Sequence, residues 1–143
     1  MPYRYRDDIA TADVAFEAWG VTVEDAFIAA ADATMNVMVE NLDAIGRSAE
    51  FVIELAHEQL DLLLFNLLNE LVFFKDARGL LLRVEKLSIK RAVSEFTLKG
   101  SVYGETLDPE KHRLNVDVKA VTLHRFSLRK TDAGWEAFVI LDI

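Results

Sequence analysis

Two acidic residues lie in segments whose composition predicts strands of the core. Asp13 follows the small residues Thr11 and Ala12, and Asp142 ends the apolar run WEAFVILDI together with Ile143 and its carboxylate. Acidic residues are depleted in strands, and burying a carboxylate without a counter-charge costs several kcal/mol. A bound cation would offset that cost, although Asp13 taken alone is more often a turn or cap residue. Oxygen ligands without a thiolate or a clear imidazole favour a hard ion, Ca²⁺ or Mg²⁺, over zinc.

The common signatures of enzymes do not occur in the sequence. The six glycines are scattered and form no phosphate-binding loop, and the chain contains no HExxH, no GxSxG and no Cys/His ligand spacing. Of the three histidines, His57 precedes an expected helix, His112 lies in a charged segment, and His124 shares the inward parity of an expected strand. A hydrogen-bonded core histidine is the simplest interpretation of His124. No catalytic set emerges, and we expect a protein that is not an enzyme.

The charge of the chain is divided unevenly between its two halves. Residues 1–74 contain 14 acids and 3 bases, a balance of −11, whereas residues 75–143 contain 10 acids and 13 bases, a balance of +3, which together give the net charge of −8. An acidic surface repels phosphate backbones, so strong direct binding of nucleic acid is not expected. A basic protein partner or a metal ion suits this surface better.

The composition also indicates where the protein acts. The chain has no cysteine, which is compatible with a reducing compartment. Its first residues, MPYRYRDD, lack the apolar stretch of a secretory signal. The most apolar run, residues 60–74, is too short and too polar to span a bilayer. We therefore expect a cytoplasmic protein that does not enter membranes.

Hydrophobic periodicity predicts two main helices among strands. Thr22 and Asp25 resemble a capping box before the first helix. The second helix is apolar over most of its circumference, so it is either central or faces a partner. The parity of the apolar positions changes near Lys86, which predicts a bulge. The expected elements are strands within 3–19 with a break near residues 7–8, a helix 23–39, a loop 40–50, a strand 51–56, a helix 58–76, strands 80–90 and 92–104, a loop 105–114, a strand 116–130, a turn 131–134 and a strand 135–143.

This order of elements favours one architecture. Helices and strands do not alternate throughout, so an α+β fold is more consistent with the pattern than a doubly wound parallel fold. With 143 residues, 52% of them hydrophobic, the chain suffices for a single domain over residues 1–143 with a substantial core. We expect a mixed, mostly antiparallel β-sheet with two main helices packed on it. The short turn DAG would close a terminal β-hairpin, and the apolar C-terminal strand would be docked, with both faces buried.

Four segments resemble the archease family, in the order and at the spacing of that family. They are TADVAFEAWG at residues 11–20, LLNEL at 67–71, VKAVTLH at 118–124 and the closing WEAFVILDI. The resemblance covers nearly the whole chain. It implies a small, non-catalytic α+β protein that assists the GTP-dependent RNA ligase in tRNA splicing by promoting guanylylation of the ligase and multiple turnover.

The resemblance also implies roles for particular residues. Asp13 of the TAD motif, Asp142 and the terminal Ile143 would form a divalent-metal site, with Ca²⁺ as the expected ion and Mg²⁺ as the alternative. Lys119 and His124 would support activation of the ligase. The family usually has a histidine directly before TAD, where this chain has Ala10, and Leu123 and Leu141 replace the usual tyrosine and phenylalanine. The absence of that histidine would reduce the affinity for metal.

Two other functions remain open from the residues. The same carboxylates could bind Mg²⁺ in a small metal-dependent phosphoester hydrolase, with Lys119 steadying the charge. Alternatively, the apolar second helix could be the contact surface of a chaperone-like interaction module. Turnover by the protein alone would favour the first alternative, and an exposed apolar helix would favour the second.

Overall fold

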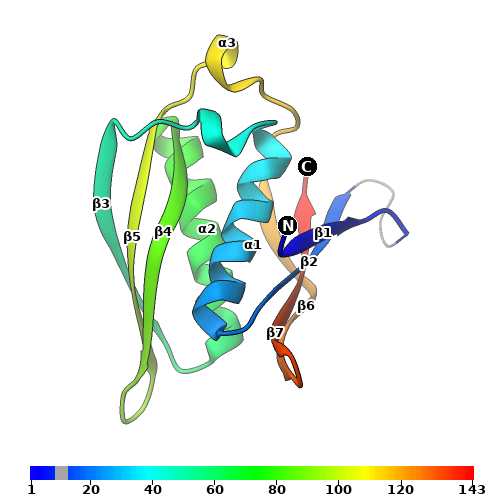
Figure 1. Cartoon of the computed structure of the whole chain (residues 1–143), viewed down its shortest axis with the longest axis vertical. Coiled ribbons are helices and arrows are strands. Elements are labelled where there is room, and N and C mark those ends of the chain that lie inside the picture. Colours follow the sequence, from blue (N-terminus) through cyan, green and yellow to red (C-terminus); the bar gives the residue numbers. More distant parts are fainter. Residues whose placement is uncertain (9–12) are drawn as a thin grey trace.

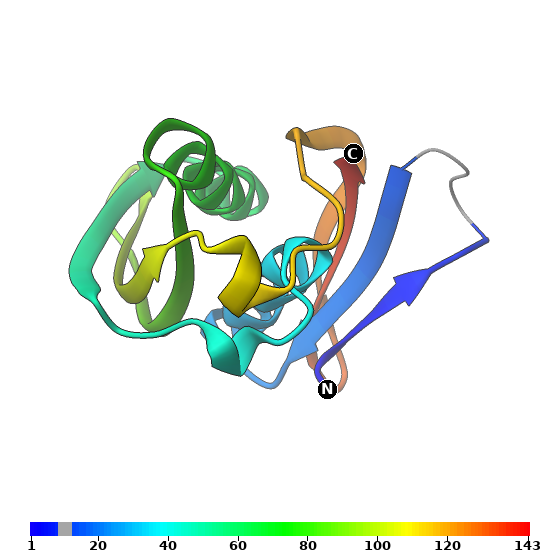
Figure 2. The same ribbon diagram turned by 90° about the horizontal axis from the view of Figure 1, so that it is seen from above.

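The computed structural model describes residues 1–8 and 13–143 and has three layers, in which two helices lie between two antiparallel sheets (Figures 1 and 2). One sheet has the strand order β1-β2-β7-β6 and the other β3-β5-β4. In the described residues the elements are β1 (Tyr3–Arg6), β2 (Asp13–Gly20), α1 (Val23–Met38), the 3₁₀ turn η1 (Leu42–Ala44), β3 (Ala49–His57), α2 (Leu60–Arg78), β4 (Leu80–Arg91), β5 (Phe96–Thr106), α3 (Pro109–His112), β6 (Ala120–Thr131) and β7 (Gly134–Asp142).

The predicted α+β fold, with its antiparallel strands and terminal hairpin, is confirmed. The strands divide into two sheets of four and three strands instead of joining in one. The predicted first helix begins as expected, because Thr22 Oγ1 accepts a hydrogen bond from the backbone N–H of Asp25 at 3.1 Å. The last strand is docked as expected, since β7 lies between β2 and β6. Both faces of its second half are covered, and Val139, Ile140 and Leu141 are buried.

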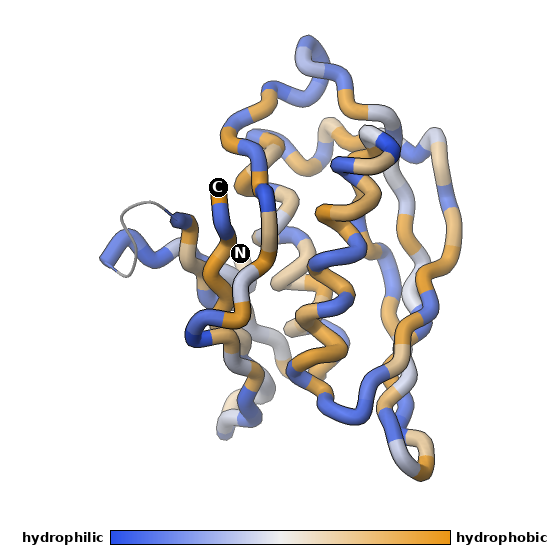
Figure 3. The backbone as a smooth tube through the Cα atoms, turned by 180° about the vertical axis from the view of Figure 1, so that it is seen from behind, coloured by the Kyte–Doolittle hydropathy of each residue, from blue (hydrophilic) through white to orange (hydrophobic). Residues whose placement is uncertain are grey.

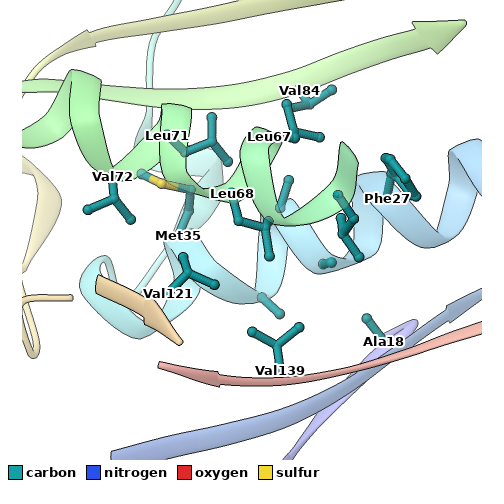
Figure 4. Packing of buried hydrophobic residues seen from close by; sticks show 14 of the residues in the cluster. Ala18, Phe27, Met35, Leu67, Leu68, Leu71, Val72, Val84, Val121 and Val139 are labelled. Atoms are coloured by element: carbon teal, nitrogen blue, oxygen red, sulfur yellow. The ribbon is translucent and has the colours of Figure 1, made fainter. Parts of the chain in front are cut away.

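Helix α2 lies at the centre of the molecule, which explains its apolar circumference. In Figure 4, Leu67 and Leu71 lie toward Val84 of β4, whereas Leu68 lies on the side of Val139 of β7. All five of these side chains belong to one buried hydrophobic cluster. Figure 3 shows the hydrophobic positions concentrated along the helices and the strands that face them. Of the two interpretations left open by the sequence, the structure shows the central one, and two facing sheets supply the partners for both sides of the helix.

One predicted bulge is present and a second was missed. The register of β4 against β5 shifts between Val84 and Lys86, as expected. The register of β6 against β7 also shifts, between Thr122 and Ser127, and Arg125 within this shift has a left-handed backbone with φ of 56°. A register shift ends the strict alternation of side chains. The prediction of His124 as a core residue is therefore wrong, and its side chain is exposed.

The charged segment before β6 is also more ordered than an exposed loop. It contains the short helix α3, and His112 in that helix is only 1% exposed. The backbone N–H of Asp108 donates to His112 Nδ1 at 2.9 Å, so the proton on Nε2 can be donated to Glu105 Oε1 at 2.6 Å. Glu105 also pairs with Lys111 at 2.7 Å. These contacts fasten α3 onto the end of β5.

The pH dependence of stability should report on this cluster. The Lys111 ammonium, the Gly46 backbone N–H and the His112 ring lower the pKa of Glu105 to about 2. A lowered pKa in the folded state means that the stabilisation is complete above the ordinary pKa of Glu and is lost as the pH falls toward 2. Glu105→Gln should flatten the decrease in unfolding free energy below about pH 4.5, measured by urea unfolding at a series of pH values. Glu110→Gln, at an exposed position of α3, should retain the wild-type dependence of the unfolding free energy on pH. If this dependence were the same for the wild type and both variants, Glu105 would not be the group responsible.

Candidate metal site at the end of the four-stranded sheet

The two acids singled out in the sequence are direct neighbours in space. Asp13 at the start of β2 and Asp142 at the end of β7 are Cα partners across the antiparallel pair. Directly opposed residues on antiparallel strands project from the same face of a sheet, with their Cβ atoms about 5 Å apart. Figure 2 shows the C-terminus beside the strand that begins at Asp13. Asp142 is exposed and Asp13 is half-buried.

The strand β6 flanks the same pair from the other side. Ala120 is the partner of Asp142 on β6, and the backbone N–H of Lys119 donates to the Asp142 carbonyl oxygen at 2.8 Å. Lys119 has an exposed side chain. Ile143 follows Asp142 and packs partly buried against the hydrophobic core. The fold thus places Asp13, Lys119 and Ile143 around Asp142, although 106 residues of sequence separate Asp13 from Lys119.

His124 lies further from this group. The last regular pair before the register shift is Thr122 with Ile140, and His124 follows it within the shifted segment. The structure therefore places His124 within β6, exposed and displaced along the strand from the pair of acids, whereas Lys119 lies directly before β6.

The chemistry of this end of the sheet fits a hard cation. Two carboxylates directly opposite each other repel, and among the described residues neither Asp13 nor Asp142 forms an ion pair with a basic side chain. Within residues 1–8 and 13–143, no group of three or more His, Asp or Glu side chains is arranged to hold a metal ion. A site at this position would therefore need a third donor of another kind, and the Ile143 carboxylate is adjacent. Ala10, which stands where a histidine is usual, lies outside the described residues.

A buried cation on α2 was missed in the sequence. Lys75 is 7% exposed, and its ammonium bonds to Asp117 and to the backbone just before Lys119. Burial alone would lower the pKa of this lysine, but its hydrogen bonds with Asp117 and Asp76 raise the pKa overall. Its burial could have been predicted from its spacing in the sequence. Lys75 follows Leu68 and Val72 at steps of four and three residues, which places it on the buried side of the helix.

No helix in the part of the chain that the structure describes is long and apolar enough to cross a membrane.

Comparison with known proteins shows which family this chain belongs to. A model of the Archease protein family (MTH1598/TM1083) matches residues 3–143. The archease of Pyrococcus furiosus is 38% identical over 134 residues, which cover 93% of this chain and 94% of that protein. The archease of Archaeoglobus fulgidus is 32% identical over the full length of both chains.

Solved structures show the same relationship. The solution structure of protein 1598 from Methanobacterium thermoautotrophicum has a TM-score of 0.85 to this one at 30% identity, and the match covers 99% of both chains. A crystal structure from Thermotoga maritima, described as an archease and possible chaperone, shares the fold with a TM-score of 0.55 at 18% identity over 96% of this chain and 97% of that one. The class is thus that of small α+β proteins with two helices between antiparallel sheets. The chain belongs to the archease family, as its four motifs indicated.

Proposed function

We propose that this protein is a non-catalytic activator of the GTP-dependent RNA-splicing ligase that joins tRNA exons. Asp13, Asp142 and the Ile143 carboxylate would hold a divalent ion, Ca²⁺ in preference to Mg²⁺, and the acidic end of the four-stranded sheet would meet the ligase. Lys119, directly before the flanking strand β6, and His124 within that strand would support guanylylation of the ligase. Family membership motivates the proposal, and the direct pairing of Asp13 with Asp142 is the observation that carries it.

The charge distribution supports a protein partner. Residues 1–74, which supply β1, β2, α1, β3 and most of α2, have a balance of −11. A negatively charged surface favours encounter with a basic surface of a protein partner and repels the phosphate backbone of a nucleic acid. An ion bound at the paired acids would supply a local positive charge that a phosphate or carboxylate of the partner complex could meet.

Purified ligase provides the direct test. Adding the protein to the ligase with GTP and Ca²⁺ should raise the rate and extent of guanylylation and allow several rounds of RNA joining per ligase molecule. The ligase alone and the ligase with metal-depleted protein in a chelator are the controls. An unchanged rate of guanylylation at saturating protein would refute the proposed function.

A C-terminal extension should impair the site without unfolding the protein. A short Gly-Ser extension after Ile143 would remove the α-carboxylate from that residue, and we expect a loss of Ca²⁺ affinity of about tenfold or more, the range for disturbed metal sites. Because β7 stays paired with β2 and β6, the melting temperature in chelator should remain near that of the wild type. The same extension at Met1 is the matched control, and equal Ca²⁺ isotherms for both extended proteins would exclude the carboxylate as a ligand.

The alternative functions find less support. Helix α2 uses most of its apolar circumference for packing between the sheets, although Phe73 is 53% exposed. This leaves little of the helix for a chaperone-like contact surface. A hydrolase would need a general base beside the metal, and His124 is displaced along β6 from the paired acids. If the protein alone hydrolysed any member of a panel of phosphoesters, the hydrolase would be preferred over the activator.

A further inference from the structure

The buried lysine of α2 joins the helical layer to the segment that enters the candidate site. Lysine is almost never fully buried unless it is paired, and Lys75 is 7% exposed. Its Nζ donates to Asp117 Oδ1 at 2.6 Å and to the Val118 carbonyl oxygen at 2.8 Å. It also forms an ion pair with Asp76 in the same helix. One ammonium group therefore holds two consecutive residues at the entrance to β6.

The segment before Asp117 is held by its backbone to the end of α1, because the N–H groups of Glu40, Asn115 and Val116 donate to the carbonyl oxygens of Arg113, Met38 and Val37. Residues 113–117 are all exposed. Beneath them lies a cavity of about 170 Å³, lined by this segment and by Met38, Lys75, Leu81 and Leu107. Ordered packing resumes at Val118, which is 0% exposed. Lys75 thus acts on Asp117 and Val118, between the residues that pair with the end of α1 and the start of β6 at Ala120.

The next residue makes the connection to the paired acids. Lys119 donates its backbone N–H to the Asp142 carbonyl oxygen at 2.8 Å, and Ala120 is the register partner of Asp142. A shift of residues 117–118 would therefore move the Lys119 side chain and release one of the bonds that hold the end of β7. The path runs from the last turn of α2 to Asp142 through three consecutive residues, Asp117, Val118 and Lys119.

We propose that Lys75 is a positioning residue, which fixes the entrance of β6 so that Asp142 stays in register with Asp13 and Lys119 is presented beside them. This inference rests on the proposed metal site and goes beyond it, because it assigns the geometry of that site to a residue of the buried helix.

The substitution Lys75→Met separates positioning from stability and from charge. Asp117 has a side chain that is 63% exposed, so it remains hydrated when the ammonium is removed. Removing one partner of an ion pair is strongly destabilising when the other charge stays buried, but the two carboxylates left by Lys75→Met, Asp76 and Asp117, are both exposed, so we expect only a modest loss of stability. Removing a positive charge near the site should strengthen cation binding if electrostatics alone decides. If Lys75 positions the site, its removal should instead weaken cation binding.

Two measurements on Lys75→Met test the proposal. Hydrogen exchange of the Lys119 amide in the metal-free protein should be at least about tenfold faster than in the wild type, because its bond to Asp142 loosens. Calorimetry should show Ca²⁺ affinity reduced about tenfold, the lower end of the effect of residues that orient metal ligands. Unchanged exchange at Lys119, or equal or tighter Ca²⁺ binding, would overturn the proposal.

A matched control uses Arg83, a half-buried cation that joins a helix to a sheet. Arg83 on β4 pairs with Asp32 of α1 at 3.2 Å, away from β6 and β7. Arg83→Met should lower the melting temperature, because it leaves the carboxylate of Asp32 half-buried without its partner, yet it should leave both Lys119 exchange and Ca²⁺ affinity unchanged. If Arg83→Met changed them as much as Lys75→Met does, the effect would be general loosening and the proposal would fail.

A second pair of variants keeps the test decisive if Lys75→Met does not fold. Asp117→Asn and Asp76→Asn each remove one carboxylate that contacts Lys75, and their side chains are 63% and 53% exposed. Only Asp117 lies in the segment that enters β6. Asp117→Asn should speed Lys119 exchange severalfold and Asp76→Asn should not, whereas equal effects would overturn the proposal. Absence of Ca²⁺ binding in the wild type would instead count against the proposed function, while the exchange result would still test the role of Lys75.

Discussion

Replacing Asp142 with alanine is expected to reduce Ca²⁺ affinity by at least about 100-fold and to abolish stimulation of the ligase. Substitution of residues that only support metal ligands already costs 10–100-fold in affinity, and Asp142 is itself a proposed ligand. Its Cα partner Asp13 would keep one carboxylate at the site. Isothermal titration with Ca²⁺ and the guanylylation assay measure the two effects. An isotherm equal to that of the wild type would exclude Asp142 as a ligand.

Asp132→Ala is the matched control for this substitution. Asp132 lies exposed in the turn at the opposite end of the same β6–β7 hairpin. Its removal takes the same charge from the same pair of strands, so a general loss of negative charge would affect both variants. We expect the Ca²⁺ isotherm of Asp132→Ala to match that of the wild type.

Measurements of stability should distinguish the metal-free site from the Ca²⁺-bound site. Without divalent ions, Asp142→Ala removes the repulsion between opposed carboxylates and should change the unfolding free energy by no more than about 1 kcal/mol, in the stabilising direction. With Ca²⁺ at 100 times its dissociation constant, the wild type should gain about 2.7 kcal/mol and the variant almost nothing. Thermal unfolding in chelator and in Ca²⁺ measures this crossover. An equal shift in both proteins would place the binding elsewhere.

Leu67→Ala is expected to have the largest effect on stability, a loss of about 2–5 kcal/mol of unfolding free energy. Leu67 is fully buried on α2 and lies toward Val84 (Figure 4). Because α2 is packed from both sides by sheets that are themselves held in register, the surroundings have little freedom to close the cavity. Urea unfolding followed by circular dichroism measures the loss.

The control comes from the same helix. Phe73 is larger than Leu67 but 53% exposed, so Phe73→Ala should cost no more than about 1 kcal/mol, chiefly the edge contact with Phe74. If Phe73→Ala proved as destabilising as Leu67→Ala, the exposed side of α2 would be more important to the fold than its burial indicates. If Phe73→Ala left stability unchanged but abolished stimulation of the ligase, this side of the helix would belong to the contact surface.

The sequence by itself determined the order and type of the main strands and of the two long helices, but not the short helix α3. Periods of two and of three to four residues identified the strands and both main helices, and the capping residue Thr22 marked the start of α1. The apolar circumference of residues 58–76 indicated a helix that is either central or faces a partner, and the structure decided for the central position. Asp13 and Asp142 were found as acids in apolar strands, and the motifs around them identified the family.

The tertiary structure alone decided which residues meet. Local patterns do not report strand register over long separations, and a shift of one residue moves a side chain to the other face. The missed register shift in β6 therefore turned His124 outward, and the contacts of α3 with β5 buried His112. The division into two sheets and the contact of Lys75 with residues 117–118 depend in the same way on how separate segments pack. The sequence supplied two acids 129 positions apart, and the antiparallel pairing of β2 with β7 made them neighbours.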